Sequence, residues 1–383
     1  MSLPPIVTLT FNPKLNRIST NKNLQDGLSA VVQIGDTLWV ANDEGTSLER
    51  LAPVKRHKPG VMAFGSHERF ALRDFLRLPR KVKGSKNQPE VDVEGLAYVE
   101  GYLWLVGSHS LIRSKPELGD GDKKARQQLQ QVSRTGNRYL LARIPVKEAN
   151  GTPTLAKKAT WDGKKLAAAQ LRGDDHGNDM TEALRHDEHL GPFLGIPGKD
   201  NGFDIEGLAV VGKRIFLGLR GPVLRGWAVI VEIEPKEDRK HPGLLKLKSI
   251  GPKGCSYRKH FLHLEGLGIR DLCVQGPDLL ILAGPTMSLD GPVKVFRWKG
   301  GADPKGECMV PKNDVNCVLE IPHGSDVGHA EGMTLFASSS GQADSLMVVY
   351  DSIPKQRQSD TCTVTADLFP LTGKLKSQTQ LVP

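Results

Sequence analysis

The stretch DVEGLAYV, residues 92–99, decides how the chain is organised, because close copies of it recur. The copies are DIEGLAVV (204–211), HLEGLGIR (263–270) and HAEGMTLF (329–336), with a weaker one, LQDGLSAV, at 24–31. Each copy carries an acid beside a glycine, where a buried strand would normally carry an apolar residue. Repeats separated by several tens of residues are typical of solenoids and propellers.

The recurring acid sets the period of the repeat, and its steps are 68, 112, 59 and 66 residues. After each acid-Gly-(Leu/Met) come an apolar strand, a short turn and a second apolar strand, such as YLWLVGS (102–108), which indicates a β-hairpin. Two further strands follow in most repeats. Four antiparallel strands in roughly 60 residues describe a propeller blade. We therefore predict an all-β fold, a single β-propeller domain over residues 1–383 with five four-stranded antiparallel blades, six being the alternative.

The step of 112 residues predicts an insertion within one blade. DMTEALRHDEHLGP (179–192) is typical of a helix, with Asp179 as N-cap, Glu182 as capping-box partner and Gly191-Pro192 as the stop. GKKLAAAQLRG (163–173) also favours a helix. We expect a helical or loop insertion near residues 150–200. The strands IVTLTF (6–11) and TVTADLF (363–369) would share one blade and close the ring.

Composition and charge narrow the classes of partner. The net charge of +9 favours a small anionic ligand, but the basic residues are dispersed and aromatic residues are few, which disfavours nucleic acid. Some basic residues gather in RLPRKVKGSK (77–86). No apolar run approaches the roughly 18 residues of a membrane span. We expect a monomer without a membrane partner.

The chain start and the cysteines bear on the compartment. The start MSLPPIVTL lacks a basic region and a cleavage-like site, which favours the cytoplasm. A periplasmic or secreted protein is the alternative if a signal peptide has been removed. The five cysteines show no CxxC spacing, so unpaired thiols are favoured, with a Cys308–Cys317 pair as the alternative.

In a propeller the innermost strand of each blade lines a central channel, so the recurring acids are expected to face one another. The five acids are Asp26, Glu94, Glu206, Glu265 and Glu331. Residues two apart on a strand point the same way, which adds a supporting set two positions before the glutamates. This set comprises Asp92, Asp204, His263 and His329. Like charges about 6 Å apart repel by roughly 3 kcal/mol per pair at an effective dielectric of about 20, so the ring needs compensation.

Three kinds of compensation are open: a bound cation, inward-reaching arginines or lysines, and proton uptake by some of the acids. A ring of oxygen ligands without thiolates suits a hard cation, and Ca²⁺ better than Mg²⁺, with the five acids as ligands. The competing interpretation is that each glutamate accepts backbone N–H bonds from the neighbouring blade and acts as a latch.

Hairpin geometry places further polar residues at the mouth of this channel, because the second strand ends at the face where the first begins. Arg220 and Arg225 flank a Gly-Pro turn and could clamp a phosphate or a carboxylate, or else compensate the acids. His109 is a candidate general acid or base, and Glu206 a group that polarises water. The same face would hold the remaining ligand-binding candidates, Asn42, Asp43 and Asp351.

At DVEGLAYV, GSHS (107–110), KDNGFDIEGLAVV (199–211) and GLRGPVLRG (218–226), the chain resembles an uncharacterised family of bacterial proteins. That family looks related to phytase-like and esterase-like β-propellers. Resemblance to β-propeller phytases implies Ca²⁺ in and near the channel and phosphomonoester hydrolysis by a metal-activated water. The chain departs from phytases in its basic charge and in lacking their dense acidic calcium clusters.

The leading hypothesis is a Ca²⁺-dependent hydrolase of a small anionic ester, in particular a phosphoester, with its site at the channel mouth and no nucleotide cofactor. One alternative is a non-catalytic binding scaffold in which the channel carboxylates are structural. Another is a lactonase-like or sugar-active hydrolase that uses the same metal.

Overall fold

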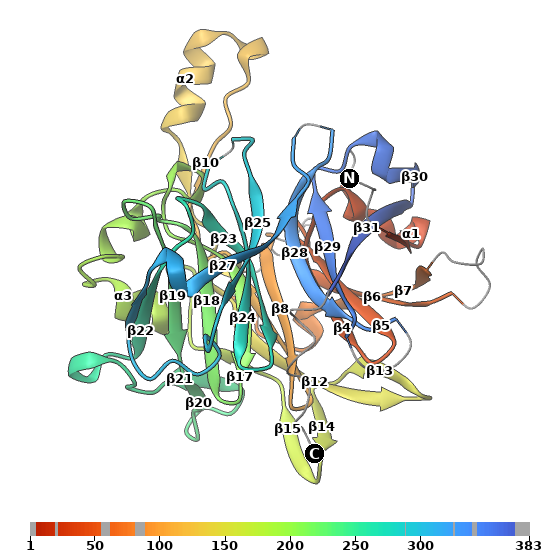
Figure 1. Ribbon diagram of the computed structural model, residues 1–383, viewed down its shortest axis with the longest axis horizontal. Coiled ribbons are helices and arrows are strands. Elements are labelled where there is room, and N and C mark those ends of the chain that lie inside the picture. Colours follow the sequence, from red (N-terminus) through yellow and green to blue (C-terminus); the bar gives the residue numbers. More distant parts are fainter. Residues whose placement is uncertain are drawn as a thin grey trace.

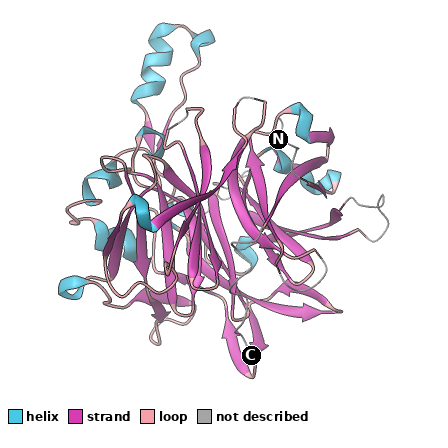
Figure 2. Ribbon diagram, viewed as in Figure 1, coloured by secondary structure: helices cyan, strands magenta, loops and turns pink. Residues whose placement is uncertain are grey.

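Antiparallel β-sheets make up most of this protein, as the computed structural model shows (Figures 1 and 2). It describes residues 5–19, 22–54, 62–80, 89–287, 289–324, 326–338 and 343–371. The predicted all-β, propeller-like fold is confirmed. The segment RLPRKVKGSK lies mostly outside the described residues.

The strands group into antiparallel runs of four, each starting at a copy of the motif or close after it. The first run is β4 (Leu28–Ile34), β5 (Thr37–Asn42), β6 (Ser47–Pro53) and β7 (Met62–Ala71). The second is β8 (Val93–Val99), β9 (Tyr102–Gly107), β12 (Leu141–Ala149) and β16 (Ala169–Leu171). The third is β17 (Asp204–Val211), β18 (Arg214–Gly221), β19 (Trp227–Ile233) and β22 (Tyr257–His263).

The fourth run is β23 (Gly268–Gln275), β24 (Asp278–Gly284), β25 (Val293–Trp298) and β27 (Val315–Ile321). The fifth is β28 (His329–Phe336), β29 (Ser345–Asp351), β31 (Thr363–Pro370) and β1 (Ile6–Thr10). The strand β1 also pairs in parallel with β7, so it joins the fifth run to the first. We interpret these five runs as the blades.

The first strands of the runs form the inner part of the molecule. Each packs mainly against the first strands of two other runs, in the cyclic order β4, β8, β17, β23, β28 and back to β4. Apolar clusters fill the spaces between neighbouring runs. In β24, Leu279 and Ile281 pack toward the third run, whereas Leu280 and Leu282 pack toward the fifth. A strand buried on both faces reads as a continuous apolar segment, which is why DLLILAG has no polar alternation.

Shorter strands extend or flank these sheets. They are β2 (Arg17–Ser19), β3 (Lys22–Asn23), β10 (Ile112–Arg113), β11 (Val132–Ser133), β13 (Thr152–Leu155), β14 (Lys158–Trp161), β15 (Lys164–Ala167), β20 (Pro235–Glu237), β21 (Leu244–Leu247), β26 (Cys308–Val310) and β30 (Gln358–Asp360). The α-helices in the described ranges are α1 (Pro13–Asn16), α2 (Asp122–Gln130) and α3 (Asp179–Leu184). The helix α2, which we did not predict, projects away from the sheets (Figure 1).

The predicted helical insertion near 150–200 is corrected in two respects. Residues 163–173 contain β15 and β16 instead of a helix, and β16 is the outer strand of the second run. The helix α3 is real but short, and its N-cap is Asn178 instead of Asp179. The Asn178 side chain accepts from the N–H groups of Met180 and Thr181, an arrangement that satisfies two backbone donors of the first turn. None of the described helices is long and apolar enough to cross a membrane.

Candidate functional site

A β-bulge near the start of every inner strand identifies the residues that are structurally equivalent. The register with the second strand shifts between Leu28 and Ala30, and at the corresponding places in the other runs. The residues skipped by these shifts are Ser29, Glu94, Glu206, Arg270 and Glu331. We call these five residues the bulge ring. An extra residue in one strand re-aims its side chain, which explains the polar residue inside an apolar strand.

Two of the five acids that we predicted to face one another, Asp26 and Glu265, do not belong to the bulge ring. Asp26 precedes its strand and accepts hydrogen bonds from the backbone and side chain of Asn23, within its own turn. Glu265 lies in the turn before β23 and forms ion pairs with Lys294 at 2.7 Å and Lys312 at 3.0 Å. These lysine bonds hold the pKa of Glu265 at about 2. The positions that belong to the ring are Ser29 and Arg270.

Arginines neutralise one side of the bulge ring. Arg270 Nη1 lies 2.9 Å from Glu206 Oε2 and 3.0 Å from Glu331 Oε1, so it bridges the third and fifth runs. Arg220 Nη1 lies 2.8 Å from Glu206 Oε1, and Arg220 also pairs with Asp204. Burial alone would lower the pKa of Arg220, but Asp204 and Glu206 raise it above the ordinary value. Arg220 is therefore committed to acids of the protein itself.

The latch role that we considered for the glutamates is filled by Asp271, the residue after Arg270. Its Oδ1 accepts from the N–H of Leu272 and its Oδ2 from the N–H of Met333 in β28, both at 2.7 Å. Ser29 makes a second link between runs, because its hydroxyl donates to the carbonyl of Val93 at 2.6 Å. These bonds tie inner strands of neighbouring runs to one another.

The opposite side of the ring has acids without such partners. Burial, and then Asp92, Glu206, Glu331 and Asp43, raise the pKa of Glu94 well above its usual range. Burial, and then Asp92, Asp351 and Glu90, raise the pKa of Asp43 to about 8, with Lys199 opposing. In the part of the chain that the structure describes, neither Asp43, Glu94 nor Asp351 forms an ion pair with a basic side chain. We call these three residues the acidic mouth.

Gly27 makes room for two carboxyl groups of the acidic mouth. A Cβ on Gly27 would lie 3.0 Å from Asp43 Oδ1 and 3.1 Å from Asp351 Oδ1. The C-terminal ends of two second strands, β5 and β29, thus bring Asp43 and Asp351 to one point beside β4. A Cβ at position 27 would crowd Asn42 and both acids, which would have to shift by a few tenths of an ångström.

The predicted calcium ligands are not assembled in this arrangement. Among the described residues, no three His, Cys, Asp or Glu side chains are grouped so that they could hold a metal ion. Asp26 and Glu265 lie outside the bulge ring, and Glu206 is paired with two arginines. The residues as they stand do not fit a Ca²⁺ centre made from the five predicted acids.

His109 is buried and hydrogen-bonded through both ring nitrogens. Its Nδ1–H donates to the Gly107 carbonyl at 2.7 Å, and its Nε2 accepts from Asn178 Nδ2 at 2.7 Å. Burial lowers the pKa of His109 to about 4, with the bond to Gly107 opposing. A neutral imidazole with no free nitrogen has no route to a substrate proton, which argues against the predicted acid–base role.

Of the four predicted supporting residues, only the two aspartates lie near the ring. Asp92 Oδ2 lies 2.8 Å from Arg138 Nη1, and Asp204 pairs with Arg220. His263 packs edge-on against Trp227, with ring centroids 5.5 Å apart. His329 is exposed, with Nε2 3.5 Å from Asp290.

Two remaining predictions concern Asn42 and the cysteines. Asn42 is buried, donates to the Leu24 carbonyl and accepts from the N–H of Glu44, so it serves the local turn. All five cysteines are free, including Cys308 and Cys317, as the spacing favoured.

Comparison with known proteins identifies the family. The chain belongs to the protein family DUF3616, described as a protein of unknown function, whose profile matches residues 27–367. This confirms the resemblance to an uncharacterised family and does not connect the chain with phytases. A search of curated proteins finds no match.

Solved structures with a similar fold include several enzymes. Glutaminyl cyclase from Myxococcus xanthus is 11% identical with a TM-score of 0.37, and the match covers 96% of this chain and 100% of that one. Exo-beta-1,3-galactanase from Phanerochaete chrysosporium is 8% identical with a TM-score of 0.37, covering 97% and 64%. Aldose sugar dehydrogenase from Streptomyces coelicolor is 11% identical with a TM-score of 0.33, covering 96% and 100%. A likeness of this size carries no information about activity.

Proposed function

We propose that the protein binds a small positively charged group at the acidic mouth, between Asp43, Glu94 and Asp351. The observation that carries this proposal is the local excess of carboxyl groups. Asp92, Glu206, Glu331 and Asp43 all raise the pKa of Glu94, and Arg220, which also senses Glu94, is paired with Asp204 and Glu206 instead. Such a cluster has to take up protons or attract a cation.

The chemistry of the ligand follows from the spacing of the acids. A divalent metal needs several oxygens within about 2.6 Å of one point, so the three carboxyl groups would have to converge. An organic ammonium group needs only N–H···O distances of about 2.7 to 2.9 Å, which separated carboxylates provide more easily. Both ligands share a positive charge, and both displace protons from the same acids.

The test is a calorimetric titration of the purified protein with CaCl₂ and, separately, with methylammonium chloride, at several pH values. Because Asp43 holds its proton up to a pH of about 8, protons compete with the cation below that pH. The affinity should therefore rise with pH and level off above about 8. Repeating the titration in buffers of different ionisation enthalpy should reveal proton release on binding.

Two matched variants test whether the cation binds at the acidic mouth. Glu94→Gln should weaken cation binding at least tenfold, whereas Glu265→Gln, a change of the same kind at the lysine-paired surface acid, should leave it unchanged. Binding of CaCl₂ alone would identify a metal site, and binding of methylammonium alone an amine site. The absence of binding by both, or equal affinities in the two variants, would refute the proposal.

Acid–base hydrolysis is the second candidate, and the approach of two carboxyl groups to one point beside Gly27 favours it. Asp43, whose pKa is raised to about 8, would be the general acid at neutral pH, and the Asp351 carboxyl group would be the candidate base. An uncharged ester, lactone or glycoside suits this site better than a phosphoester, because Arg220 is already bound by Asp204 and Glu206.

A turnover screen with and without EDTA separates the hydrolases. The substrates are a phosphomonoester, a phosphodiester, a lactone and nitrophenyl glycosides. Turnover that survives EDTA and disappears in Asp43→Asn would support acid–base hydrolysis. Phosphoester turnover abolished by EDTA would instead support the Ca²⁺-dependent hydrolase inferred from the sequence. No turnover with any substrate, together with cation binding, would leave the binding protein as the function.

A further inference from the structure

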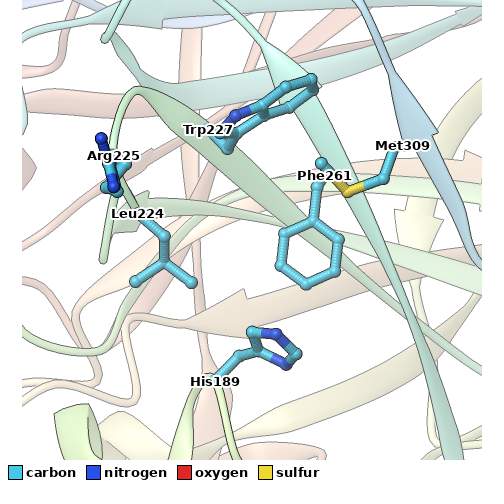
Figure 3. A pocket seen from close by; sticks show the side chains of 6 residues that line it. All are labelled: His189, Leu224, Arg225, Trp227, Phe261 and Met309. Atoms are coloured by element: carbon cyan, nitrogen blue, oxygen red, sulfur yellow. The ribbon is translucent and has the colours of Figure 1, made fainter.

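A cavity lies on the third run, and it shares no residue with the bulge ring or the acidic mouth. Its volume is about 490 Å³, within the usual range for sites that hold small molecules. The walls come from β19, β22, β26, the turn before β19 and the segment after α3 (Figure 3). The lining residues are His189, Leu224, Arg225, Trp227, Phe261 and Met309.

Most of the cavity wall is apolar and aromatic. Trp227, Phe261 and Leu224 border the same space, and Met309 is 56% exposed at its edge (Figure 3). The Trp227 ring is held in place by its edge-on contact with His263. Flat aromatic surfaces and a methionine favour a planar, apolar ligand group, since such a group gains from stacking and from burial.

The turn that carries Arg225 places this residue in a backbone conformation that arginine does not favour. Leu224 and Trp227 exchange both backbone hydrogen bonds across two residues, Arg225 and Gly226, with φ values of +49° and +89°. This is a type I′ hairpin turn, whose first central position favours asparagine, aspartate or glycine. Arginine there costs stability, and a residue that breaks a local rule is often retained for what its side chain does.

The guanidinium of Arg225 is available to a ligand. Arg225 is exposed, and its side chain forms no hydrogen bond or ion pair with the residues that the structure describes. Arg220, five residues earlier, is by contrast held by Asp204 and Glu206. A free arginine beside an apolar cavity is suited to a carboxylate, because it can donate two parallel hydrogen bonds.

His189 supplies a second donor. The ammonium group of Lys259 is paired with Asp187 at 2.5 Å and donates to His189 Nδ1 at 3.1 Å. An imidazole that accepts at Nδ1 carries its hydrogen on Nε2 when it is neutral. Because Nδ1 accepts from Lys259, a ring hydrogen lies on Nε2, and His189 adds an N–H donor to the guanidinium of Arg225 among the lining residues.

We propose that this cavity binds a small aromatic carboxylate, with its ring between Trp227 and Phe261 and its carboxylate on Arg225 and His189. This proposal is independent of the function proposed for the acidic mouth. Charge complementarity selects an anion, and the stacking surfaces select a planar ring.

The test uses phenylacetate, benzyl alcohol and benzylamine as probes, which share a benzyl group and differ in charge. Binding to the full chain is measured by saturation-transfer NMR and by calorimetry. Phenylacetate should bind at least tenfold more tightly than benzyl alcohol, and benzylamine most weakly. Binding of benzylamine equal to that of phenylacetate, or no binding of phenylacetate, would overturn the proposal.

The variant Arg225→Asn gives the sharpest control. Asparagine suits the φ of this position, so the melting temperature should stay the same or rise, while phenylacetate affinity falls at least tenfold. Benzyl alcohol affinity should not change. Arg126→Gln, at an exposed arginine of α2, should alter neither. Trp227→Phe should weaken all three probes, and an unchanged phenylacetate affinity in Arg225→Asn would refute the assignment.

Discussion

Glu94 and Glu206 begin from nearly the same sequence, DVEGLAYV and DIEGLAVV, and end in opposite electrostatic surroundings. Glu206 lies between Arg220 and Arg270 and forms ion pairs with both. In the bulge ring, Glu94 has Ser29 on one side and Glu206 on the other, with no described base in contact. One of the two arginines, Arg220, belongs to the same run as Glu206, and the other, Arg270, comes from the next run. A repeated motif therefore specifies a position in the ring, whereas residues outside the motif specify the electrostatic surroundings of that position.

Removal of Arg270 should reduce the free energy of unfolding more than any other change in this series. It would leave carboxyl groups on the arginine side of the ring without a basic partner, as in the acidic mouth. Arg270→Met leaves Glu206 and Glu331 without their shared partner, at a cost of about 3 to 5 kcal/mol in the free energy of unfolding. Urea denaturation at pH 7 measures this loss of stability. Adding Glu331→Gln should recover part of the loss, and a loss below about 1 kcal/mol would show that the ion pairs are unimportant.

Asp271→Asn tests the latch between the fourth and fifth runs. Both carboxylate oxygens accept backbone N–H groups, so an amide must place its NH₂ group against one of these donors. We expect a loss of about 1 to 3 kcal/mol in the free energy of unfolding. An undiminished stability in urea would mean that the backbone donors find another partner.

The acidic mouth should make stability depend on pH. The pKa of Asp43 is raised from 3.8 to about 8, so between these pH values the folded protein binds more protons than the unfolded chain. The free energy of unfolding should therefore fall as pH rises from about 4 to about 8, by up to about 1.4 kcal/mol per pH unit for this group.

Asp43→Asn isolates that contribution, since asparagine resembles the neutral acid. Thermal melts from pH 5 to pH 9 should show a shallower decline in the variant than in the parent protein. The two proteins should differ most at the alkaline end. Parallel pH profiles would contradict the raised pKa of Asp43.

Glu265→Gln should have the smallest effect of the series. Its ion pairs with Lys294 and Lys312 lie at the surface, where such pairs contribute about 1 kcal/mol or less. Urea denaturation in low salt should detect at most that change. A larger loss would mean that the turn before β23 depends on this acid.

The sequence was sufficient to predict the all-β fold, because a strand buried on both faces has to be apolar along its whole length. It misplaced two ring positions because the Gly-Leu pairs at 27–28 and 266–267 imitate the motif just before the true bulges. The spacing to the following strand is a better signal for four of the five ring positions. Ser29, Glu94, Glu206 and Arg270 each stand eight residues before the first residue of the following strand, whereas Asp26 and Glu265 do not.

The arginine compensation could not be deduced from the repeats. Arg270 occupies the position that holds a glutamate in three other runs, so alignment on the acid hides it. Arg220 was visible in the sequence, but only the fold shows that Asp204 and Glu206 bind it. The helices were misjudged for a different reason, since GKKLAAAQLRG has helical propensity that pairing with β12 and β14 overrides.

The pairing of β1 with both β31 and β7 has a consequence for biosynthesis. On the ribosome, Thr10 is translated 353 residues before its antiparallel partner Thr363. The strand β1 must therefore wait for the four intervening runs and most of the fifth run to be translated before the circle can close. Until then its edge is open to other chains, so crowded translation is the stage at which this protein is most exposed to aggregation.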